Sequence, residues 1–438
     1  MSSPSASPAP APTPTPATWQ VCASCGSEIP ETDSHPRCPR CRGLLEVRHQ
    51  PPAQGGSALR ATFDARWGVR RGVLASGVWR YREAVLPTAG EHILSYPEGN
   101  TPLLTSAPVA RWAGAPELLL KHEGQNPTGS FKDRGMTVGV TQARRVKARA
   151  VACASTGNTA AALAAYAALA GLPALVLVPK GQVALGKLAQ ALAYGARTLL
   201  VRGNFDDCLE LADQASERLG VYLLNSVNPF RLEGQKTIVL ELLQQLGWEP
   251  PDWIVVPAGN LGNTAAFGKA LVEARAWGLI DRVPKLAAVQ AEGAAPFAQS
   301  FRDGFAQLRR VEPRTVATAI KIGNPASYER AVRAIRDTSG VVTTVSDDEI
   351  LEAKAVVDGA GIGCEPASAA AIAGARRLMR DGTTRPRDRV IAVLTGHVLK
   401  DPETVARYHQ EMEPRPAGAN RPIEIEARLA EVERVMAG

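Results

Sequence analysis

The stretch Asn126-Pro127-Thr128-Gly129-Ser130-Phe131-Lys132-Asp133-Arg134-Gly135 decides the fold and places a lysine at the start of a helix. It follows the apolar run 118–120 and leads into a helical pattern from Met136 onward. The positive field of a helix N-terminus and partial burial both disfavour a protonated amine, and a neutral amine can form a Schiff base with a carbonyl compound. An ordinary surface lysine at a helix start is the alternative.

The composition is that of a soluble globular protein with two or three domains. Hydrophobic residues make up 45% of the 438 residues and charged residues 21%, while aromatic residues reach only 5%. No apolar run is long enough to cross a bilayer, so we expect no membrane association. The net charge of +7 is spread along the chain, and we expect no nucleic-acid binding. The positive charge is interpreted as that of an ordinary basic soluble protein, and the more specific alternative is that it attracts anionic metabolites.

Four of the seven cysteines form two pairs, Cys22-x2-Cys25 and Cys38-x2-Cys41. Two such pairs can supply four thiolates to one zinc ion, and a site closed by four thiolates is structural. His35 lies between the pairs and is interpreted as a bystander. The ribbon is expected to act as a folding staple, with nucleic-acid binding as the alternative. The other cysteines are scattered and form no disulfide framework, which favours a reducing cytoplasm.

Segments of different character follow one another along the chain. Residues 1–18 are rich in Ser, Ala, Pro and Thr and predict a disordered tail without a secretory signal. Residues 19–48 carry the cysteine pairs, and residues 49–60 form a linker. Strand-like and helical runs then alternate. The expected strands are 150–154, 174–178, 198–201, 221–224, 253–256, 286–290, 341–345 and 390–394. The expected helices are 160–170, 185–194, 205–219, 231–246, 264–277 and 347–359, the last opened by a capping box of Ser346 and Glu349.

Short buried strands alternating with helices predict parallel sheets, whose ligands bind in the loops after the strands. The loop 155–159 (Ser155-Thr156-Gly157-Asn158-Thr159) offers more polar groups than an N-cap needs. The loop 258–264 has two glycines before a helix and can cradle a phosphate, with a simple glycine turn as the alternative. Thr395 ends a strand with a hydroxyl, and His397 is interpreted as a structural hydrogen-bonding residue.

A Schiff-base lysine, a polar loop, a phosphate cradle and a strand-end hydroxyl together fit pyridoxal 5′-phosphate. These stretches, with Gly99-Asn100-Thr101-Pro102-Leu103 and Leu399-Lys400-Asp401-Pro402, resemble the tryptophan-synthase-β-like (fold type II) pyridoxal-phosphate enzymes, and among them the threonine synthases. The resemblance implies an α/β fold of two three-layer, doubly wound parallel-sheet domains after the zinc-ribbon-like segment. The large cofactor domain would comprise 49–136 and 241–438, and the small mobile domain 137–240. A homodimer is usual for this fold.

The resemblance also implies a carbon–oxygen lyase that converts O-phospho-L-homoserine and water to L-threonine and phosphate. Lys132 would carry the cofactor and move protons, Asn158 would bind the phenolic oxygen, and Thr395 would meet the ring nitrogen. The cofactor phosphate would be bound by Gly259, Asn260, Leu261, Gly262 and Asn263. The substrate carboxylate would be bound by Ser155 and Thr156, and the substrate phosphate by Thr159, Lys187, Asn225, Ser226 and Arg231. For Lys187, a helix-surface lysine is the alternative.

Two other functions remain open at this point. A threonine or serine dehydratase of the same fold would use the same lysine and cradle but would not need Arg231 with Asn225-Ser226. A non-catalytic protein could use the ribbon to bind nucleic acid or a protein partner, and the intact Lys132 motif argues against it.

Overall fold

A small antiparallel sheet opens the part of the chain that the computed structural model describes, which is residues 17–181 and 185–437, without the side chains of 182–187. The sheet has the order β2-β1-β3, and its strands are β1 (Thr18–Cys22), β2 (Glu28–Pro30) and β3 (Leu45–His49). The tail expected over 1–18 lies outside the described residues as far as residue 16, and β1 already includes Thr18.

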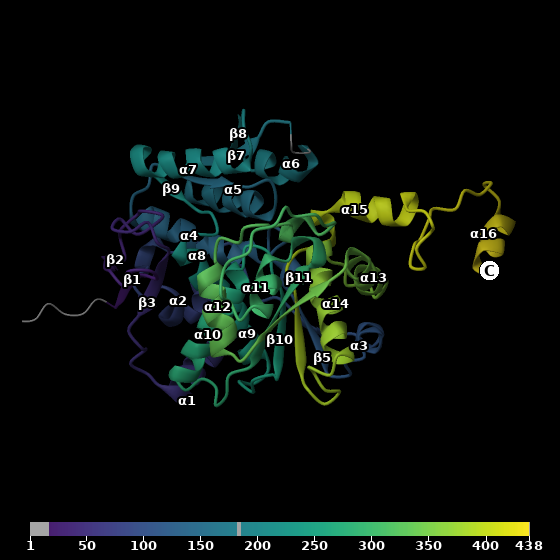
Figure 1. The fold of residues 1–438 in the computed structure, drawn as a ribbon, viewed down its shortest axis with the longest axis horizontal. Coiled ribbons are helices and arrows are strands. Elements are labelled where there is room, and N and C mark those ends of the chain that lie inside the picture. The colour runs from purple at the N-terminus through teal and green to yellow at the C-terminus, as the bar shows by residue number, and fades with distance from the viewer. Residues whose placement is uncertain (1–16, 182–184, 438) are drawn as a thin grey trace, which may run out of the picture.

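A six-stranded sheet, here called the large sheet, has the order β12-β11-β10-β13-β5-β4 (Figure 1). Along β10, Ile254 and Val256 pack into one buried cluster, whereas Trp253 and Val255 pack into another. Both faces are therefore covered, which explains why these strands are continuous apolar runs in the sequence. The strands are β4 (Leu103–Thr105), β5 (Leu118–His122), β10 (Trp253–Pro257), β11 (Lys285–Ala291), β12 (Val341–Val345) and β13 (Val390–Leu394).

A four-stranded parallel sheet, the small sheet, has the order β8-β7-β6-β9 and comes from one continuous stretch of chain. Its strands are β6 (Ala150–Ala154), β7 (Ala174–Pro179), β8 (Arg197–Val201) and β9 (Val221–Leu223). Figure 1 shows it above the large sheet with α5, α6 and α7 around it, while the C-terminal α15 and α16 lead away from the body.

The helices follow the expected alternation, with small shifts at their ends. The capping box of α13 is confirmed, because the side chains of Ser346 and Glu349 each accept the backbone N–H of the other. Within the described residues, no helix has the length and apolar character needed to span a membrane. The helices are α1 (Gly56–Ala65), α2 (Arg82–Val85), α3 (Ala107–Ala113), α4 (Lys132–Arg145), α5 (Asn158–Ala170), α6 (Leu185–Ala193), α7 (Phe205–Leu219), α8 (Pro229–Gln235), α9 (Thr237–Gln245), α10 (Gly262–Ala276), α11 (Pro296–Arg302), α12 (Tyr328–Asp337), α13 (Asp347–Gly359), α14 (Pro366–Arg380), α15 (Pro402–Ala406) and α16 (Leu429–Ala437).

Three elements differ from the sequence expectation. Helix α1 begins at Gly56, inside the stretch 49–60 that was expected to be a linker. The strand β4 pairs antiparallel with β5, so the large sheet is mixed and not purely parallel. A three-residue edge strand is too short to give a periodic signal, and an antiparallel neighbour does not need the long crossover connection that a parallel neighbour needs. The single helix expected over 231–246 begins earlier, because the Asn228 side chain caps Pro229–Gln235. It is interrupted at Lys236, where the Thr237 hydroxyl donates to Gly234 O at 2.6 Å.

Candidate active site

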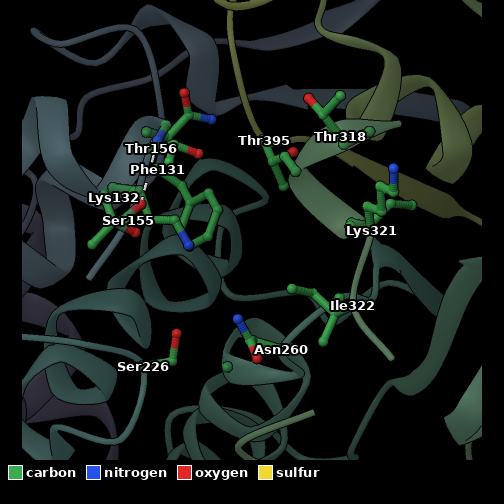
Figure 2. Close-up of a pocket in the computed structure, with 18 of the residues that line it drawn as sticks. Phe131, Lys132, Ser155, Thr156, Ser226, Asn260, Thr318, Lys321, Ile322 and Thr395 are labelled. Atoms are coloured by element: carbon green, nitrogen blue, oxygen red, sulfur yellow. Dashed lines mark hydrogen bonds between the residues drawn. The ribbon is translucent and has the colours of Figure 1, made fainter. Parts of the chain in front are cut away.

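A cavity of about 1450 Å³ collects the candidate cofactor and substrate residues (Figure 2). Segments that follow β5, β6, β9, β10 and β13 build its wall, as expected for ligands of parallel sheets. In Figure 2, Lys132, Ser155 and Thr156 lie on one side and Thr395 and Lys321 on the other. Lys187 belongs to α6, and its side chain lies outside the described residues. The candidate residues that line the cavity are Lys132, Ser155, Thr156, Asn158, Thr159, Asn225, Ser226, Arg231, Gly259, Asn260, Leu261, Gly262, Asn263 and Thr395.

The loop that carries Lys132 is hydrogen-bonded to the residues after β13. The N–H of Phe131 donates to Thr395 O at 3.0 Å, and the N–H of His397 donates to Gly129 O at 2.9 Å. Ser130 and Gly396 form an antiparallel bridge between these two bonds. The pairing ties the lysine loop to Thr395, although the two segments lie far apart in the sequence.

Buried side chains anchor the lysine loop from below. The Asp133 carboxylate accepts hydrogen bonds from the Thr128 N–H at 2.7 Å and the Thr128 hydroxyl at 2.5 Å. The Arg134 guanidinium makes ion pairs with Glu123 and Glu241, each at 2.7 Å, and all three side chains are fully buried. The Asp-Arg tail of the motif therefore holds the loop in place, and neither residue lines the cavity.

A close crossing of α4 and α8 brings Arg231 to the cavity wall. A Cβ added to Gly234 would lie 1.8 Å from Arg134 O, and one added to Gly135 would lie 3.0 Å from Arg231 O. Only glycine allows two helix backbones to approach this closely. The two glycines thus fix the position of Arg231 relative to the helix that begins with Lys132.

The amine of Lys132 is poised for nucleophilic chemistry. Burial, and then the positive charge of Arg231, lower the pKa of Lys132 to about 7, while the negative charge of Glu365 opposes the shift. The Nζ atom lies 4.2 Å from the centre of the Phe131 ring. A large fraction of this amine is therefore unprotonated at neutral pH and can attack a carbonyl group.

Arg231 is a buried cation without a carboxylate partner among the described residues. Its side chain is almost fully buried, Nη1 donates to Leu224 O at 2.9 Å, and Nε has no hydrogen-bond partner in the described part of the chain. Burial lowers the pKa of Arg231 to about 10, and only a thiolate at the nearby Cys153 would oppose this shift. Because a buried unpaired charge is unfavourable, this guanidinium indicates an anionic ligand.

Polar groups of two neighbouring loops face the same space. The hydroxyls of Thr156, Thr159 and Ser226 have no hydrogen-bond partner among the described residues, and each of these residues lines the cavity. Asn225 differs, because its amide bonds both the N–H and the carbonyl of Ala154, at 2.9 and 3.0 Å. Asn225 therefore joins its own loop to the end of β6 and keeps one amide hydrogen for a ligand.

The loop 259–263 opens α10 with backbone N–H groups that have no partner among the described residues. Leu261 has a φ of 64°, a left-handed conformation, directly before the helix. The hydroxyl of Thr264 is buried without a partner in the described chain. The side-chain oxygens of Asn260 and Asn263 accept hydrogen bonds from the Ala326 N–H and the Gln235 amide, so each side chain keeps its amide hydrogens for a ligand. Unpaired N–H groups at a helix start with an unpartnered hydroxyl fit a phosphate group.

A buried carboxyl that the sequence analysis did not identify lies between Asn158 and Thr395. Asn158 Nδ2 donates to Glu365 Oε2 at 2.9 Å, and Thr395 Oγ1 lies 3.2 Å from Glu365 Oε1. Glu365 precedes Pro366 at the start of α14, so its sequence context predicts only a helix start. His397 Nδ1 accepts the Leu399 N–H at 3.2 Å, in agreement with its expected structural role.

A segment between α11 and α12 also lines the cavity, through Thr318, Lys321 and Ile322 (Figure 2). It contains no strand, and the sequence analysis did not identify it. Taken together, the cavity offers a neutral amine, a phosphate cradle with an unpartnered hydroxyl, an amide and a strand-end hydroxyl. This donor set fits pyridoxal 5′-phosphate.

The four N-terminal cysteines form a separate cluster. Their sulfur atoms all lie within 4.8 Å of one another, with Cys22 and Cys41 at 3.4 Å and Cys25 and Cys38 at 3.8 Å. Tetrahedral zinc with Zn–S bonds of about 2.3 Å would place its sulfur ligands roughly 3.8 Å apart. His35 is bonded to Asp33 at 2.8 Å and is not part of the cluster. The cluster is therefore compatible with a zinc site.

Comparisons with known proteins agree with this site. Residues 94–396 match the family described as pyridoxal-phosphate dependent enzyme. The chain is 43% identical to threonine synthase of Methanocaldococcus jannaschii, over 95% of this chain and 99% of that protein. It is 46% identical to threonine synthase of Methanosarcina acetivorans, over 89% and 94%. The solved structure of threonine synthase from Escherichia coli has the same fold, with a TM-score of 0.68, 20% identity and coverage of 96% and 99%. The chain therefore belongs to the pyridoxal-phosphate-dependent enzymes and, among them, to the threonine synthase family.

Proposed function

We propose that the chain converts O-phospho-L-homoserine and water to L-threonine and inorganic phosphate, with pyridoxal 5′-phosphate held at Lys132. The observation that carries this proposal is Arg231, an almost fully buried guanidinium at the cavity wall whose Nε has no partner in the described chain. A phosphate ester is the kind of substrate that pairs with such a cation, and guanidinium binds phosphate in a bidentate manner.

The phosphate of the substrate would be held by Arg231 together with hydroxyls of both neighbouring loops. Thr159 and Ser226 line the cavity with hydroxyls that have no partner among the described residues. The remaining amide hydrogen of Asn225 adds a further donor. Binding the leaving group in this way stabilises the charge that develops when the bond from Cγ to oxygen breaks.

Bound in the cavity, pyridoxal phosphate supplies a conjugated ring that takes up negative charge from the substrate carbons. Lys132, with a pKa of about 7, can accept a proton from a substrate carbon at Nζ and return it at neutral pH. The cofactor phosphate would be bound by the backbone of Gly259 to Asn263, with Asn158 and Thr395 holding the ring at its phenolic oxygen and its nitrogen.

The substrate carboxylate would be bound by Ser155 and Thr156, at the start of α5. We assign residues 137–240 to a small mobile domain that closes over the substrate, with 49–136 and 241–438 forming the large one. The cavity wall contains segments of both sheets, so a relative movement of the two sheets would change its access to water. Closure would exclude water during elimination, and one water molecule must then enter to add to Cβ.

A threonine or serine dehydratase is the rival function, and one assay separates the two. Holoenzyme is supplied either with O-phospho-L-homoserine, with phosphate and threonine measured, or with L-threonine, with ketoacid measured. We expect phosphate and threonine in equal amounts and little ketoacid. Ketoacid as the main product would refute the proposal, because a dehydratase has no use for a buried cation at this wall.

Three further assignments belong to the same proposal. We assign structural zinc to Cys22, Cys25, Cys38 and Cys41, supported by the spacing of their sulfur atoms. One zinc per chain, measured by elemental analysis of purified protein, would test this assignment. The homodimer and the cytoplasmic location remain predictions from the resemblance and from the cysteine usage.

A further inference from the structure

Glu365 is a buried carboxyl that the proposed reaction does not use. It is 4% exposed, and its two oxygens face two different groups of the cofactor site. Asn158 Nδ2 donates to Oε2 at 2.9 Å, and Thr395 Oγ1 lies 3.2 Å from Oε1. The carboxyl thus touches both residues that are assigned to the two polar edges of the cofactor ring.

Within the part of the chain that the structure describes, no cation neutralises this carboxyl directly. Among the described residues, no lysine or arginine makes an ion pair with Glu365, and Lys132 and Lys400 act on it only from a longer distance. Burial raises the pKa of Glu365, and the bonds from Asn158 and Thr395 only partly oppose this rise. Such an environment favours the neutral acid over the carboxylate.

The hydroxyl of Thr395 lies within hydrogen-bond distance of two side chains, Glu365 and Ser368. Its Oγ1 lies 3.0 Å from Ser368 Oγ, and Ser368 Oγ in turn accepts the Gly396 N–H at 2.9 Å. A hydroxyl has a single hydrogen to donate. If Glu365 is ionised, this hydrogen goes to the carboxylate, and Thr395 can only accept a hydrogen bond from the ring nitrogen. If Glu365 is neutral, its own O–H bonds to Thr395 Oγ1, and the hydrogen of Thr395 is free for the ring nitrogen.

We propose that Glu365 is a positioning residue that carries a proton on Oε1 and thereby directs the hydroxyl of Thr395 toward the ring nitrogen of the cofactor. Oε2, which accepts from Asn158, is the carbonyl oxygen of the neutral acid. The hydroxyl of Thr395 then donates to an unprotonated ring nitrogen, and the ring withdraws charge less strongly than a pyridinium would. The inference rests on the cofactor site of the proposed function.

The test uses holoenzyme with isotope-labelled groups and does not depend on turnover. Infrared spectroscopy of protein with 13C-labelled glutamate reports a neutral carboxyl through its C=O band. The 15N chemical shift of labelled pyridoxal phosphate reports whether the ring nitrogen is protonated. The variants are Glu365→Gln, which keeps a neutral donor of similar shape, and Thr395→Val, which removes the hydroxyl. Glu98→Gln is the matched control, because Glu98 is fully buried and bonded to the Tyr166 hydroxyl at 2.9 Å but does not line the cavity.

We expect a neutral carboxyl band that disappears in Glu365→Gln and persists in Glu98→Gln. The 15N signal should lie in the unprotonated range, stay unchanged in Glu365→Gln, and move in Thr395→Val. Thr395→Val should also raise the cofactor dissociation constant about fivefold, the effect of losing one neutral hydrogen bond.

Persistence of the neutral band in Glu365→Gln, a protonated ring nitrogen in the wild type, or a 15N shift caused by Glu365→Gln would overturn the inference and leave the proposed reaction intact. A wild-type protein that binds no pyridoxal phosphate at Lys132 would instead overturn the proposed function as well.

Discussion

Replacing Arg231 by methionine should lower activity without lowering stability. Arg231 is 1% exposed, and its side chain makes one hydrogen bond to the described part of the chain, from Nη1 to Leu224 O. Methionine fills a similar volume without a charge. The folded protein therefore loses a buried cation that has no carboxylate partner in the described chain.

The expected change in the free energy of unfolding follows from the lowered pKa of Arg231. Burial lowers the pKa of Arg231 to about 10, which corresponds to about 3 kcal/mol against the charged guanidinium, at about 1.4 kcal/mol for each pH unit. The lost bond to Leu224 O costs about 1 kcal/mol. The variant should thus unfold with an unchanged free energy or be up to about 2 kcal/mol more stable. Loss of the charge-assisted bonds to the substrate phosphate should cost about 2–5 kcal/mol, or roughly 30-fold to several thousand-fold in kcat/KM.

Arg134→Met provides the matched comparison in the same part of the molecule. Arg134 is fully buried like Arg231, but it is paired with Glu123 and Glu241. Its removal leaves those carboxylates short of a partner and should destabilise the protein by about 3–5 kcal/mol.

Two measurements decide between the outcomes. Urea unfolding of cofactor-free protein gives the free energies, and phosphate release from O-phospho-L-homoserine gives kcat/KM. In holoenzyme, where the cofactor phosphate fills the cradle at 259–263, added inorganic phosphate should raise the thermal midpoint of the wild type and leave that of Arg231→Met unchanged. The reasoning is refuted if Arg231→Met is as unstable as Arg134→Met, or if it keeps the wild-type kcat/KM.

Three further predictions concern the lysine, the helix crossing and the cysteine cluster. The pKa of Lys132 is lowered to about 7, so the amine is protonated and unreactive below that pH. The rate at which cofactor-free protein takes up pyridoxal phosphate should therefore rise with pH through about pH 7. A rise centred near pH 10 would contradict this prediction. Gly234→Ala should cost about 1–3 kcal/mol by urea unfolding, because its Cβ would lie 1.8 Å from a backbone oxygen. Gly55→Ala, with no atom within 4 Å and a φ of −96°, is its control and should be close to neutral. Cys38→Ser should abolish zinc binding and lower the thermal midpoint, with kcat of the folded fraction kept within about twofold; normal stability with lost turnover would contradict a structural role.

The strands and the lysine loop could be predicted because their signals are local. The strands β6 and β13 begin and end where the apolar runs do, since each is buried on both faces and must be apolar throughout. The loops after parallel strands meet at one sheet edge, which is why 155–159 and 258–264 could be assigned to one cavity. The partial exposure of β4 and its three-residue length left no such pattern.

Glu365 and Asn225 show what local signals cannot supply. Glu365 owes its significance to Asn158 and Thr395, which reach it from distant parts of the chain. Asn225 stands in a motif that the resemblance connects with substrate, yet most of its amide is bonded to Ala154 across the small sheet. In both cases the deciding fact is a hydrogen-bond partner that only the folded chain brings close.

Two of the buried arginines, Arg134 and Arg231, cannot be distinguished by their local sequences. Arg134 and Arg231 both lie in the first turn of a helix, one or two residues from a glycine or proline, and both side chains are excluded from solvent. Their partners in the described chain differ. Arg134 is neutralised by two carboxylates, whereas the side chain of Arg231 bonds only to one backbone carbonyl. A stable fold tolerates a buried guanidinium bonded only to a carbonyl if an anion pairs with it for part of the catalytic cycle, or if its role in function outweighs the loss of stability. The unpaired charge, more than the lysine that the whole fold shares, is therefore what connects this cavity with a phosphorylated substrate.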